Sequence, residues 1–228
     1  MKKLLSVVSL AGVLLLPGCN NKNNPDDSPD PEKSDLIEIS FEVDKETYLL
    51  TDYGEPPQIA VWLEDADSKF YKTIWVTRRS GKNDWQGKVE CPVSLPYWNL
   101  RRAGEEDPGF WEKVVDAISG ATVAEGKIKK SIRVPKNKKW KSFIEVNVSG
   151  DYNKYFQYWS DNDIPDTEGN GQPSIIYTAE IGTDTLSVVL PKLTGRTNQL
   201  AADDSLYTDI EKITTARKLI KEIKVTLR

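Results

Sequence analysis

The chain has 228 residues, 38% of them hydrophobic, and a formal net charge of −4 at pH 7. This length is enough for a well-buried core, and the mild acidity argues against nucleic acid as a partner, because nucleic-acid-binding proteins carry basic patches. The chain contains no histidine, and its single methionine is Met1. Histidine-based zinc and copper sites, the usual haem ligands and histidine-dependent catalytic triads are therefore excluded. We expect no metal and no catalytic residue, and for any redox function an organic cofactor.

The first residues predict export from the cytoplasm. Lys2 and Lys3 precede the apolar segment Leu4–Leu16, whose 13 residues are too few for a permanent transmembrane helix. The segment ends in Leu16-Pro17-Gly18-Cys19, which resembles a bacterial lipobox. The resemblance implies a cleaved lipoprotein signal peptide at residues 1–18 and acylation of Cys19; an ordinary signal peptide with a chance cysteine is the alternative.

The segment after the signal peptide predicts a tether. Residues 19–34 are polar and rich in proline and asparagine, which is typical of a flexible chain, and residues 35–228 show no composition break, so we expect one domain there. Loss of Lys2 and Lys3 changes the net charge from −4 to −6. Asn20 lacks the aspartate cue for inner-membrane retention, which favours anchoring to the outer membrane.

Alternation of apolar and polar residues with a period of two predicts most of the strands. In the segment 36–43 one face carries Ile37, Ile39, Phe41 and Val43. Residues 58–65 and 70–77, separated by a turn, predict a hairpin. The same pattern predicts strands at 140–148, 175–181, 186–190 and 223–227.

Two segments break this alternation. Asp107 and Pro108 suit the start of a helix, apolar residues recur at helical spacing through Ile118, and Gly120 suits a left-handed C-cap. A second short helix is predicted around 209–216, after a long polar loop at 191–207. The elements together predict a mainly β protein, an antiparallel β-sandwich with one or two short helices, for which the immunoglobulin-like fold is one arrangement.

The string Asp116-Ala-Ile-Ser119-Gly120-Ala121-Thr122 stands out beside the expected helix. Glycine, serine and threonine are ordinary turn residues, so a capped helix followed by a turn is one explanation. The string also resembles the flavin-attachment motif of FMN-binding domains in membrane redox complexes. The resemblance implies Thr122 as the residue to which a flavin transferase links FMN through a phosphoester, Ser119, Gly120 and Ala121 as the attachment loop, and Asp116 as a recognition residue.

A wider resemblance covers most of residues 55–228. The stretches "PPQIAVWLEDADSKFYKTIWVTR", "VVDAISGAT", "GQPSIIYTAEI" and "ITTARKLIKEIKVTLR" are similar to a family of periplasmic proteins of unknown function, often encoded beside PepSY-type membrane proteins and flavin transferases. The resemblance implies an extracytoplasmic role in flavin-based electron transfer, with the transferase and a PepSY-type redox protein as partners. The remaining features of a full FMN-binding domain are absent from the sequence.

Other side chains leave alternatives open. The seven tryptophans could fill a core or stack on a ligand; Trp62 and Trp75 sit opposite their strands' aliphatic residues, so they are either exposed or covered by a second layer. The acidic stretch 161–168 does not follow the EF-hand spacing and predicts a solvated loop. A buried structural thiol is one interpretation of Cys91, whose reactivity depends on its exposure. The alternatives to a flavin carrier are a module that binds a glycan or a protein through exposed aromatic residues, and an accessory subunit of a membrane redox complex.

Overall fold

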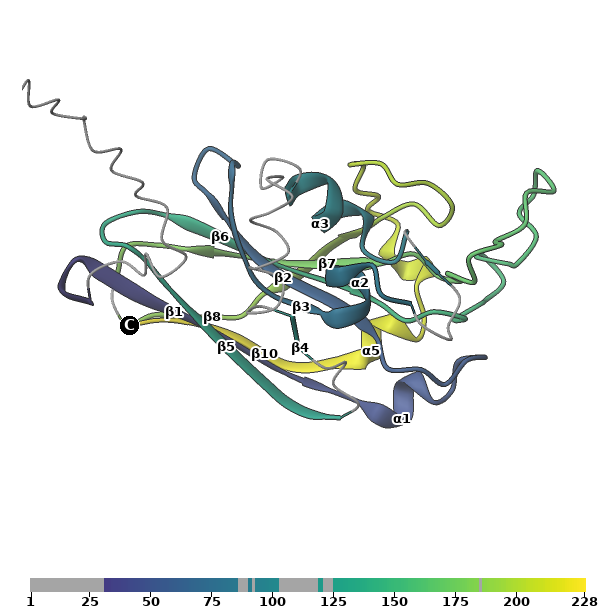
Figure 1. Cartoon of the computed structure of the whole chain (residues 1–228), viewed down its shortest axis with the longest axis horizontal. Coiled ribbons are helices and arrows are strands. Elements are labelled where there is room, and N and C mark those ends of the chain that lie inside the picture. The colour runs from purple at the N-terminus through teal and green to yellow at the C-terminus, as the bar shows by residue number, and fades with distance from the viewer. Residues whose placement is uncertain (1–30, 86–89, 92, 103–118, 121–124, 185) are drawn as a thin grey trace, which may run out of the picture.

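A computed structural model of the chain describes residues 31–228 except 86–89, 92, 103–118, 121–124 and 185 (Figure 1). The expected signal peptide, Cys19 and most of the expected tether therefore lie outside the described residues. The elements in chain order are η1 Pro31–Lys33, β1 Ser34–Val43, α1 Lys45–Tyr48, β2 Gln58–Asp65, β3 Phe70–Thr77, α2 Arg78–Lys82, α3 Pro96–Arg101, β4 Ser119–Gly120, β5 Gly126–Pro135, β6 Trp140–Asn147, β7 Ile175–Ile181, β8 Val188–Val189, β9 Lys192–Arg196, η3 Ile210–Lys212, α5 Ala216–Leu219 and β10 Ile220–Leu227.

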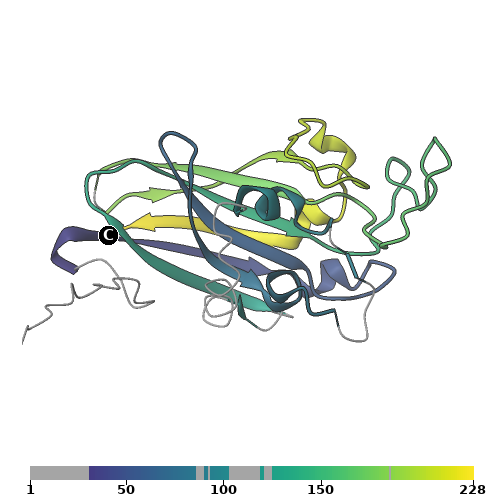
Figure 2. The same ribbon diagram turned by 45° about the horizontal axis from the view of Figure 1, so that its top comes forward.

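The strands form two stacked sheets, which confirms the predicted mainly β sandwich (Figures 1 and 2). One sheet has the order β5-β1-β10-β8, and the other has the order β4-β3-β2-β6-β7-β9. Neighbouring strands are antiparallel except the two-residue β4, which runs parallel to β3. The β2–β3 and β5–β6 turns, η1 and the C-terminus lie at one end of the sandwich, and α1, α2 and α5 lie at the other.

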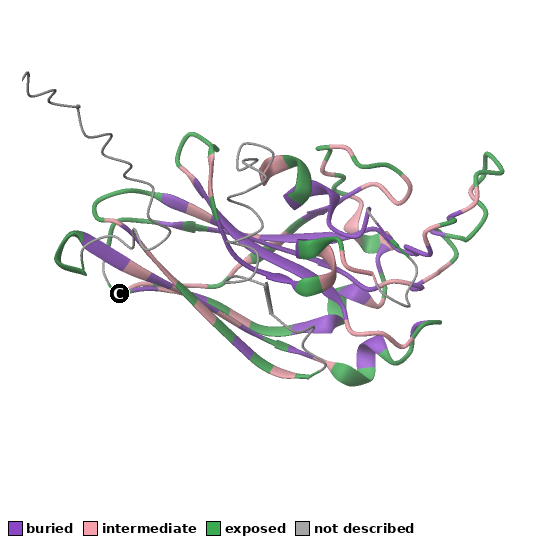
Figure 3. Ribbon diagram, viewed as in Figure 1, coloured by how far each residue is buried: buried purple, intermediate pink, exposed green. Residues whose placement is uncertain are grey.

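The main core lies between the sheets, where the period-two pattern predicts it (Figure 3). Ile37, Ile39 and Phe41 of β1 are fully buried, as are Ile59 and Val61 of β2. Each of these side chains faces the opposite sheet because every second residue of a strand points to the same side. The strands predicted at 36–43, 58–65, 70–77, 140–148 and 175–181 are confirmed to within two residues at each end.

A second, smaller core covers the outer face of the six-stranded sheet. Trp62 is stacked on Phe143, with ring centroids 4.9 Å apart and an interplanar angle of 8°. The segment containing α3 lies over them, and Leu95 and Trp98 belong to the same buried cluster. Both tryptophans left open between exposure and burial are therefore buried. This second layer covers Trp62, which is 0% exposed, whereas Trp75 is 2% exposed and belongs to the main core.

The C-terminal half differs from the prediction in its strand pairing. The segment predicted as a strand at 186–190 contributes only β8, which pairs with β10 and not with β7. Leu186, Val188 and Leu190 are 81%, 61% and 64% exposed, so their alternation does not mark a buried face. The expected loop 191–207 contains β9, which pairs with β7 and completes the six-stranded sheet.

One further element was predicted differently. The helix expected around 209–216 is divided into η3 and α5, with Ile213 in an extended conformation between them. A strand was expected after Gly126, without stated bounds, and the structure has it as β5, which pairs with β1 along its whole length, from Gly126 opposite Val43 to Pro135 opposite Ser34. Five of its ten residues are lysine, arginine or serine, and one of them, Lys130, stands between Ile128 and Ile132 on the face that packs toward the core, which weakens the apolar alternation that signals a strand.

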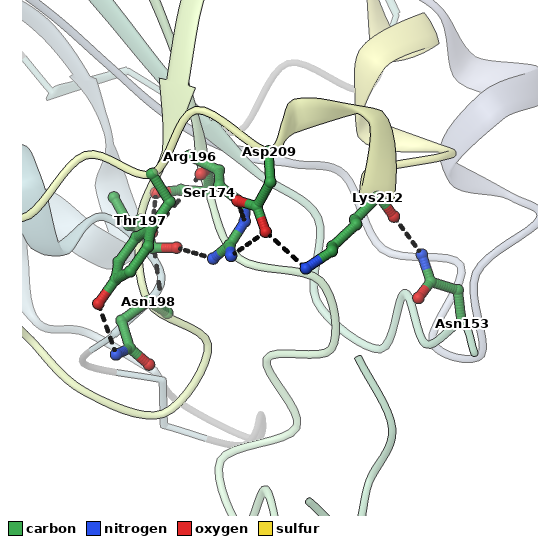
Figure 4. A network of polar contacts seen from close by, with 8 residues as sticks. Asn153, Ser174, Arg196, Thr197, Asn198, Asp209 and Lys212 are labelled. Atoms are coloured by element: carbon green, nitrogen blue, oxygen red, sulfur yellow. Dashed lines mark hydrogen bonds and ion pairs between the residues drawn. The ribbon is translucent and has the colours of Figure 1, made fainter. Parts of the chain in front are cut away.

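An ion-pair network fixes the segment after β9 (Figure 4). Arg196 makes two contacts with the Asp209 carboxylate, Nε to Oδ1 at 2.7 Å and Nη2 to Oδ2 at 2.8 Å, and Lys212 Nζ lies 2.8 Å from Oδ2. The guanidinium also donates to the backbone oxygen of Thr197 at 2.9 Å. Hydrogen bonds from Arg196 and then Lys212 hold the pKa of Asp209 well below its ordinary value.

We expect Asp209→Asn to lower the free energy of unfolding at neutral pH by about 1–2 kcal/mol, because a bidentate charge-assisted pair is lost. A depressed pKa contributes stability above the unfolded-state value and loses it as the pH falls, so the difference between wild type and variant should shrink in acid. Urea denaturation across this range measures it. Asp204→Asn, an exposed position in the same segment, is the control, and equal effects of the two substitutions would contradict the prediction.

Candidate functional site

The described part of the attachment-like motif lies at an edge of the six-stranded sheet. Ser119 and Gly120 form β4, whose backbone pairs with Val76 and Thr77 at the end of β3. Gly120 is thus a strand residue, which corrects the expected helix C-cap at this position; pairing with β3 determines its backbone. Asp116, Ala121 and Thr122 lie outside the described residues, as does the helix expected before Ser119.

Buried hydrogen bonds position the end of β3 and the helix that follows it. Thr77 Oγ1 donates to Gln58 Oε1 at 2.8 Å and accepts from the backbone N–H of Ile59 at 3.1 Å. Ser80 Oγ in α2 donates to the same amide oxygen of Gln58 at 3.1 Å. Helix α2 begins directly after Thr77 and contacts β4. The Ser119–Gly120 backbone is therefore held beside α2.

A cavity of ≈ 340 Å³ is lined by residues of α2, of α3 and of the segments that follow α2 and flank α3. Its volume is within the range of small-molecule sites. We call it the α2–α3 cavity, and the described residues that line it are Ser80, Asn83, Trp85, Glu90, Cys91, Ser94, Leu95, Trp98, Asn99 and Arg102. The sequence alone does not group these residues, because they come from separate segments that become neighbours only in the folded chain.

One wall of the α2–α3 cavity is formed by α3 and the residue after it. Trp98 is fixed by a hydrogen bond from its Nε1 to Thr73 Oγ1 at 3.0 Å. The Arg102 guanidinium carbon lies 4.7 Å from the centre of the Trp98 ring, and Arg102 Nη2 donates to Asn99 Oδ1 at 2.7 Å. This wall combines an aromatic ring with a positioned cation.

The facing wall is formed by polar side chains near the C-terminus of α2. Trp85 Nε1 donates to Asn83 Oδ1 at 2.8 Å, and Asn83 Nδ2 donates to Glu90 Oε1 at 3.4 Å. The hydroxyls of Ser80 and Ser94 lie 3.3 Å apart. Aromatic rings with a few donors and acceptors around them suit a flat heteroaromatic ligand.

The cysteine at the base of the α2–α3 cavity is a structural residue. Cys91 is 1% exposed, and its Sγ lies 3.7 Å from Asn170 Oδ1. Burial raises the pKa of this thiol, and the nearby carboxylates of Glu168 and Asp166 raise it further. The structure thus decides the question that the sequence left open for Cys91, and such a group is not a nucleophile at neutral pH because only the thiolate reacts.

Two carboxylates buried under α3 were not identified from the sequence. Glu64 is 0% exposed and is paired with Arg101, whose Nε lies 3.0 Å from Oε1. Glu145 is 0% exposed and accepts hydrogen bonds from Ser174 Oγ at 2.6 Å and from the backbone N–H of Trp98 at 2.6 Å. In the sequence these glutamates occupy the polar positions of alternating strands, which normally face solvent.

The aromatic and acidic segment after β6 forms a projecting loop at the end opposite η1 (Figure 1). Tyr158 and Trp159 are 45% and 58% exposed, and their rings meet edge to face. The expected solvated acidic loop is corrected at Asp166, which is buried and accepts from the backbone N–H groups of Asn170 and Gly171. Asp166 can be buried because its carboxylate accepts from these backbone N–H groups, which would otherwise lack an acceptor.

The described residues offer neither a membrane span nor a metal site. None of their helices is long and apolar enough to cross a bilayer. Within the same ranges no three or more cysteine and acidic side chains are grouped so that they could hold a metal ion.

Comparison with known proteins identifies a family. Residues 38–153, which extend from within β1 to beyond β6 and include the whole attachment-like motif, match the family described as "Predicted periplasmic protein (DUF2271)". No curated protein and no solved structure matches the chain. The match covers more than half of the 228 residues. The chain therefore belongs to the DUF2271 family of periplasmic proteins.

Proposed function

We propose that this protein is a lipid-anchored electron carrier outside the cytoplasm, with FMN linked covalently to Thr122. Acylated Cys19 anchors it, the outer membrane being favoured, and a flavin transferase loads it. It exchanges electrons with a PepSY-type membrane redox protein. The periplasmic family supports the compartment.

The observation that carries this proposal is the sequence Asp116-Ala-Ile-Ser119-Gly120-Ala121-Thr122 together with the placement of β4. Pairing with β3 holds Ser119 and Gly120 at a sheet edge beside α2. Two residues of chain reach at most about 7 Å, so the acceptor hydroxyl follows closely after a fixed backbone. Small residues before the acceptor let a loading enzyme approach the backbone.

The α2–α3 cavity is the place we propose for the isoalloxazine ring of such a flavin. Trp98 is buried beneath Arg102, so the half-buried Trp85 would supply the apolar contact, whereas Ser80, Asn83 and Asn99 would offer hydrogen bonds to the polar pyrimidine edge. Arg102 can place positive charge beside that edge. When bound, the flavin supplies reversible electron transfer, and the residues of this cavity would orient the ring and limit its contact with water.

The attachment step requires no catalytic residue of this chain. The Thr122 oxygen attacks the phosphorus of the FMN half of FAD, a new P–O bond forms, and the anhydride bond to AMP breaks. AMP leaves, and the threonine proton passes to a base of the transferase. The chain's part is to supply the threonine hydroxyl two residues after the β4 backbone.

The test is the intact mass of the exported chain after co-expression with a flavin transferase. We expect wild type to gain the mass of one FMN less one water and to absorb in the flavin region. Thr122→Ala should gain nothing because the acceptor oxygen is gone. Thr122→Ser, which keeps a hydroxyl, is the matched control and should retain part of the modification.

An unmodified wild-type chain beside an active transferase would refute the proposal. A transferase is shown to be active when it modifies an established substrate in the same cells. Modification of wild type and Thr122→Ala alike would place the flavin at another residue and would also contradict the proposal.

The exposed aromatic residues of the loop after β6 favour a second candidate function. Tyr155, Tyr158 and Trp159 are about half exposed, and exposed tyrosine and tryptophan faces stack on sugars and on protein partners. A glycan-binding module would bind soluble oligosaccharides with saturation, would lose binding in Trp159→Ala, and would be indifferent to Thr122→Ala. An accessory subunit would instead co-purify with the membrane redox protein and stay colourless.

A further inference from the structure

Basic residues are concentrated in one part of this acidic chain. The segment Lys127–Lys141 contains eight lysine or arginine residues and no aspartate or glutamate, although the whole chain has a net charge of −4. Seven of them define what we call the basic edge: Lys127, Lys129, Lys130, Arg133, Lys136, Lys138 and Lys139. The remainder of the protein is correspondingly acidic, so the charge distribution is strongly asymmetric.

The basic edge follows an outer strand of the sandwich. Strand β5 is the last strand of its sheet, and the turn to β6 continues from it. Lys127 and Lys129 are exposed and are paired with Glu222 and Glu38 of the same sheet, at 3.7 and 2.8 Å. In the turn, Lys136, Lys138 and Lys139 are exposed, and none of them forms an ion pair with another described residue.

Protection of the sheet edge explains only part of this charge. Lysine on an outer strand prevents pairing with another sheet, which accounts for the residues of β5. The turn has no strand edge to protect, and three unpaired cations within four residues repel one another. A negatively charged surface that covers the turn would remove this repulsion.

The polypeptide enters the domain directly beside the turn. The backbone N–H of Lys136 donates to the carbonyl of Lys33 at 3.3 Å, and Ser34 pairs with Pro135. The 14 residues from Cys19 to Glu32 lead from this point to the proposed acylation site. A flexible chain of this length has a typical end-to-end distance of about 20 Å, so the anchor keeps the turn near the bilayer.

We propose that the basic edge docks on the anionic phospholipid headgroups of the membrane to which the tether leads. This inference rests on acylation of Cys19 and is independent of FMN. The acyl chains on Cys19 alone would hold the chain at the membrane, and each lysine near an anionic surface adds an attraction that brings the basic edge to it. Residues Ser119–Gly120 and Gly126, which flank Thr122 in the sequence, lie on the side of the sandwich that β5 borders, so docking would turn that side toward the membrane.

The test measures how close the basic edge lies to lipid. The acylated mature chain is placed in vesicles of phosphatidylcholine alone or mixed with phosphatidylglycerol, with a quencher on the lipid headgroups. A fluorophore is attached through Ser131→Cys, an exposed position within the basic edge, or through Thr167→Cys, an exposed position in the loop after β6. The native Cys91 is buried and does not compete for the label.

We expect strong quenching of the Ser131→Cys label in anionic vesicles, weak quenching in neutral vesicles, and little quenching of the Thr167→Cys label in either. Adding Lys138→Gln and Lys139→Gln should lower the ratio of docked to free domain about fivefold per lysine. Lys154→Gln with Lys218→Gln removes the same charge at the other end of the sandwich and should leave the ratio unchanged. High salt should abolish the quenching, since the Debye length falls to about 3 Å at 1 M.

Each other outcome overturns the proposal. Equally weak quenching of the Ser131→Cys label in neutral and anionic vesicles would show that the edge does not bind headgroups and is left for another partner, such as an acidic protein. Equally strong quenching would show that the tether alone, and not the charge of the lipid, places the edge at the bilayer. Quenching of the Thr167→Cys label would show the opposite end facing the bilayer. A chain that fails to remain with neutral vesicles lacks its acyl anchor, which would refute the anchoring part of the proposed function separately from docking.

Discussion

Trp62→Ala is expected to lower the free energy of unfolding by about 3–5 kcal/mol, the range found when large aromatic side chains are removed from protein cores. Trp62 is fully buried and stacks on Phe143 at 4.9 Å. Its Nε1 also donates to Glu64 Oε1 at 3.2 Å, so truncation leaves both a cavity and a carboxylate with one partner fewer. A loss of this size is a large part of the 5–15 kcal/mol typical of a folded domain.

Urea denaturation at neutral pH measures this effect. Trp159→Ala is the matched control, because the same side chain is truncated at a position that is 58% exposed. We expect the control to change the free energy of unfolding by less than about 1 kcal/mol. Similar losses in the two variants would show that the layer formed by the α3 segment does not seal Trp62 from water.

The second large effect concerns Glu145, a carboxyl group enclosed beneath α3. Burial raises its pKa to about 7, although hydrogen bonds from Ser174 and from the backbone N–H groups of Trp98 and Tyr97 act in the opposite direction. Ser174 Oγ in turn lies 2.8 Å from Thr197 Oγ1, which connects Glu145 with the polar network around Arg196 (Figure 4). The native state therefore holds a proton on Glu145 that the unfolded chain releases near pH 4.5.

This difference in proton binding should make stability fall as the pH rises. Below the unfolded-state pKa of 4.5 both states of the wild type are protonated at Glu145. Between pH 4.5 and about 7 only the unfolded state loses its proton, which costs 1.36 kcal/mol per pH unit, or about 3 kcal/mol in total. Above about pH 7 both states are ionised, and the contribution of this group no longer changes.

Glu145→Gln tests this expectation because glutamine resembles the protonated acid. We expect wild type and variant to be about equally stable near pH 4.5 and the variant to gain about 3 kcal/mol relative to wild type by pH 7.5. Urea denaturation of both proteins at several pH values gives this difference and cancels the titration of other groups. Glu180→Gln, on an exposed position of the neighbouring strand β7, is the control. A pH-independent difference for Glu145→Gln would contradict the assignment.

How much of the site was predictable depends on which interactions position each residue. The attachment-like string is contiguous, so its residues could be named from the sequence, whereas its pairing with Thr77 joins positions more than 40 residues apart. The α2–α3 cavity combines Ser80 with Trp98 and Arg102, and no spacing rule relates them. Buried Glu64 and Glu145 were missed because local alternation does not reveal that the α3 segment covers the outer face of the sheet.

The sequence by itself determined the sandwich class, the strands with a clear apolar alternation and the chemical classes excluded by the lack of histidine. These properties follow from local periodicity and composition, which act along the chain. Tertiary structure alone decided that β8 pairs with β10, that β9 joins β7 and that Trp62 is enclosed. The physical reason is that a short strand or an outward side chain acquires its partner from segments distant in sequence, and local composition does not identify that partner.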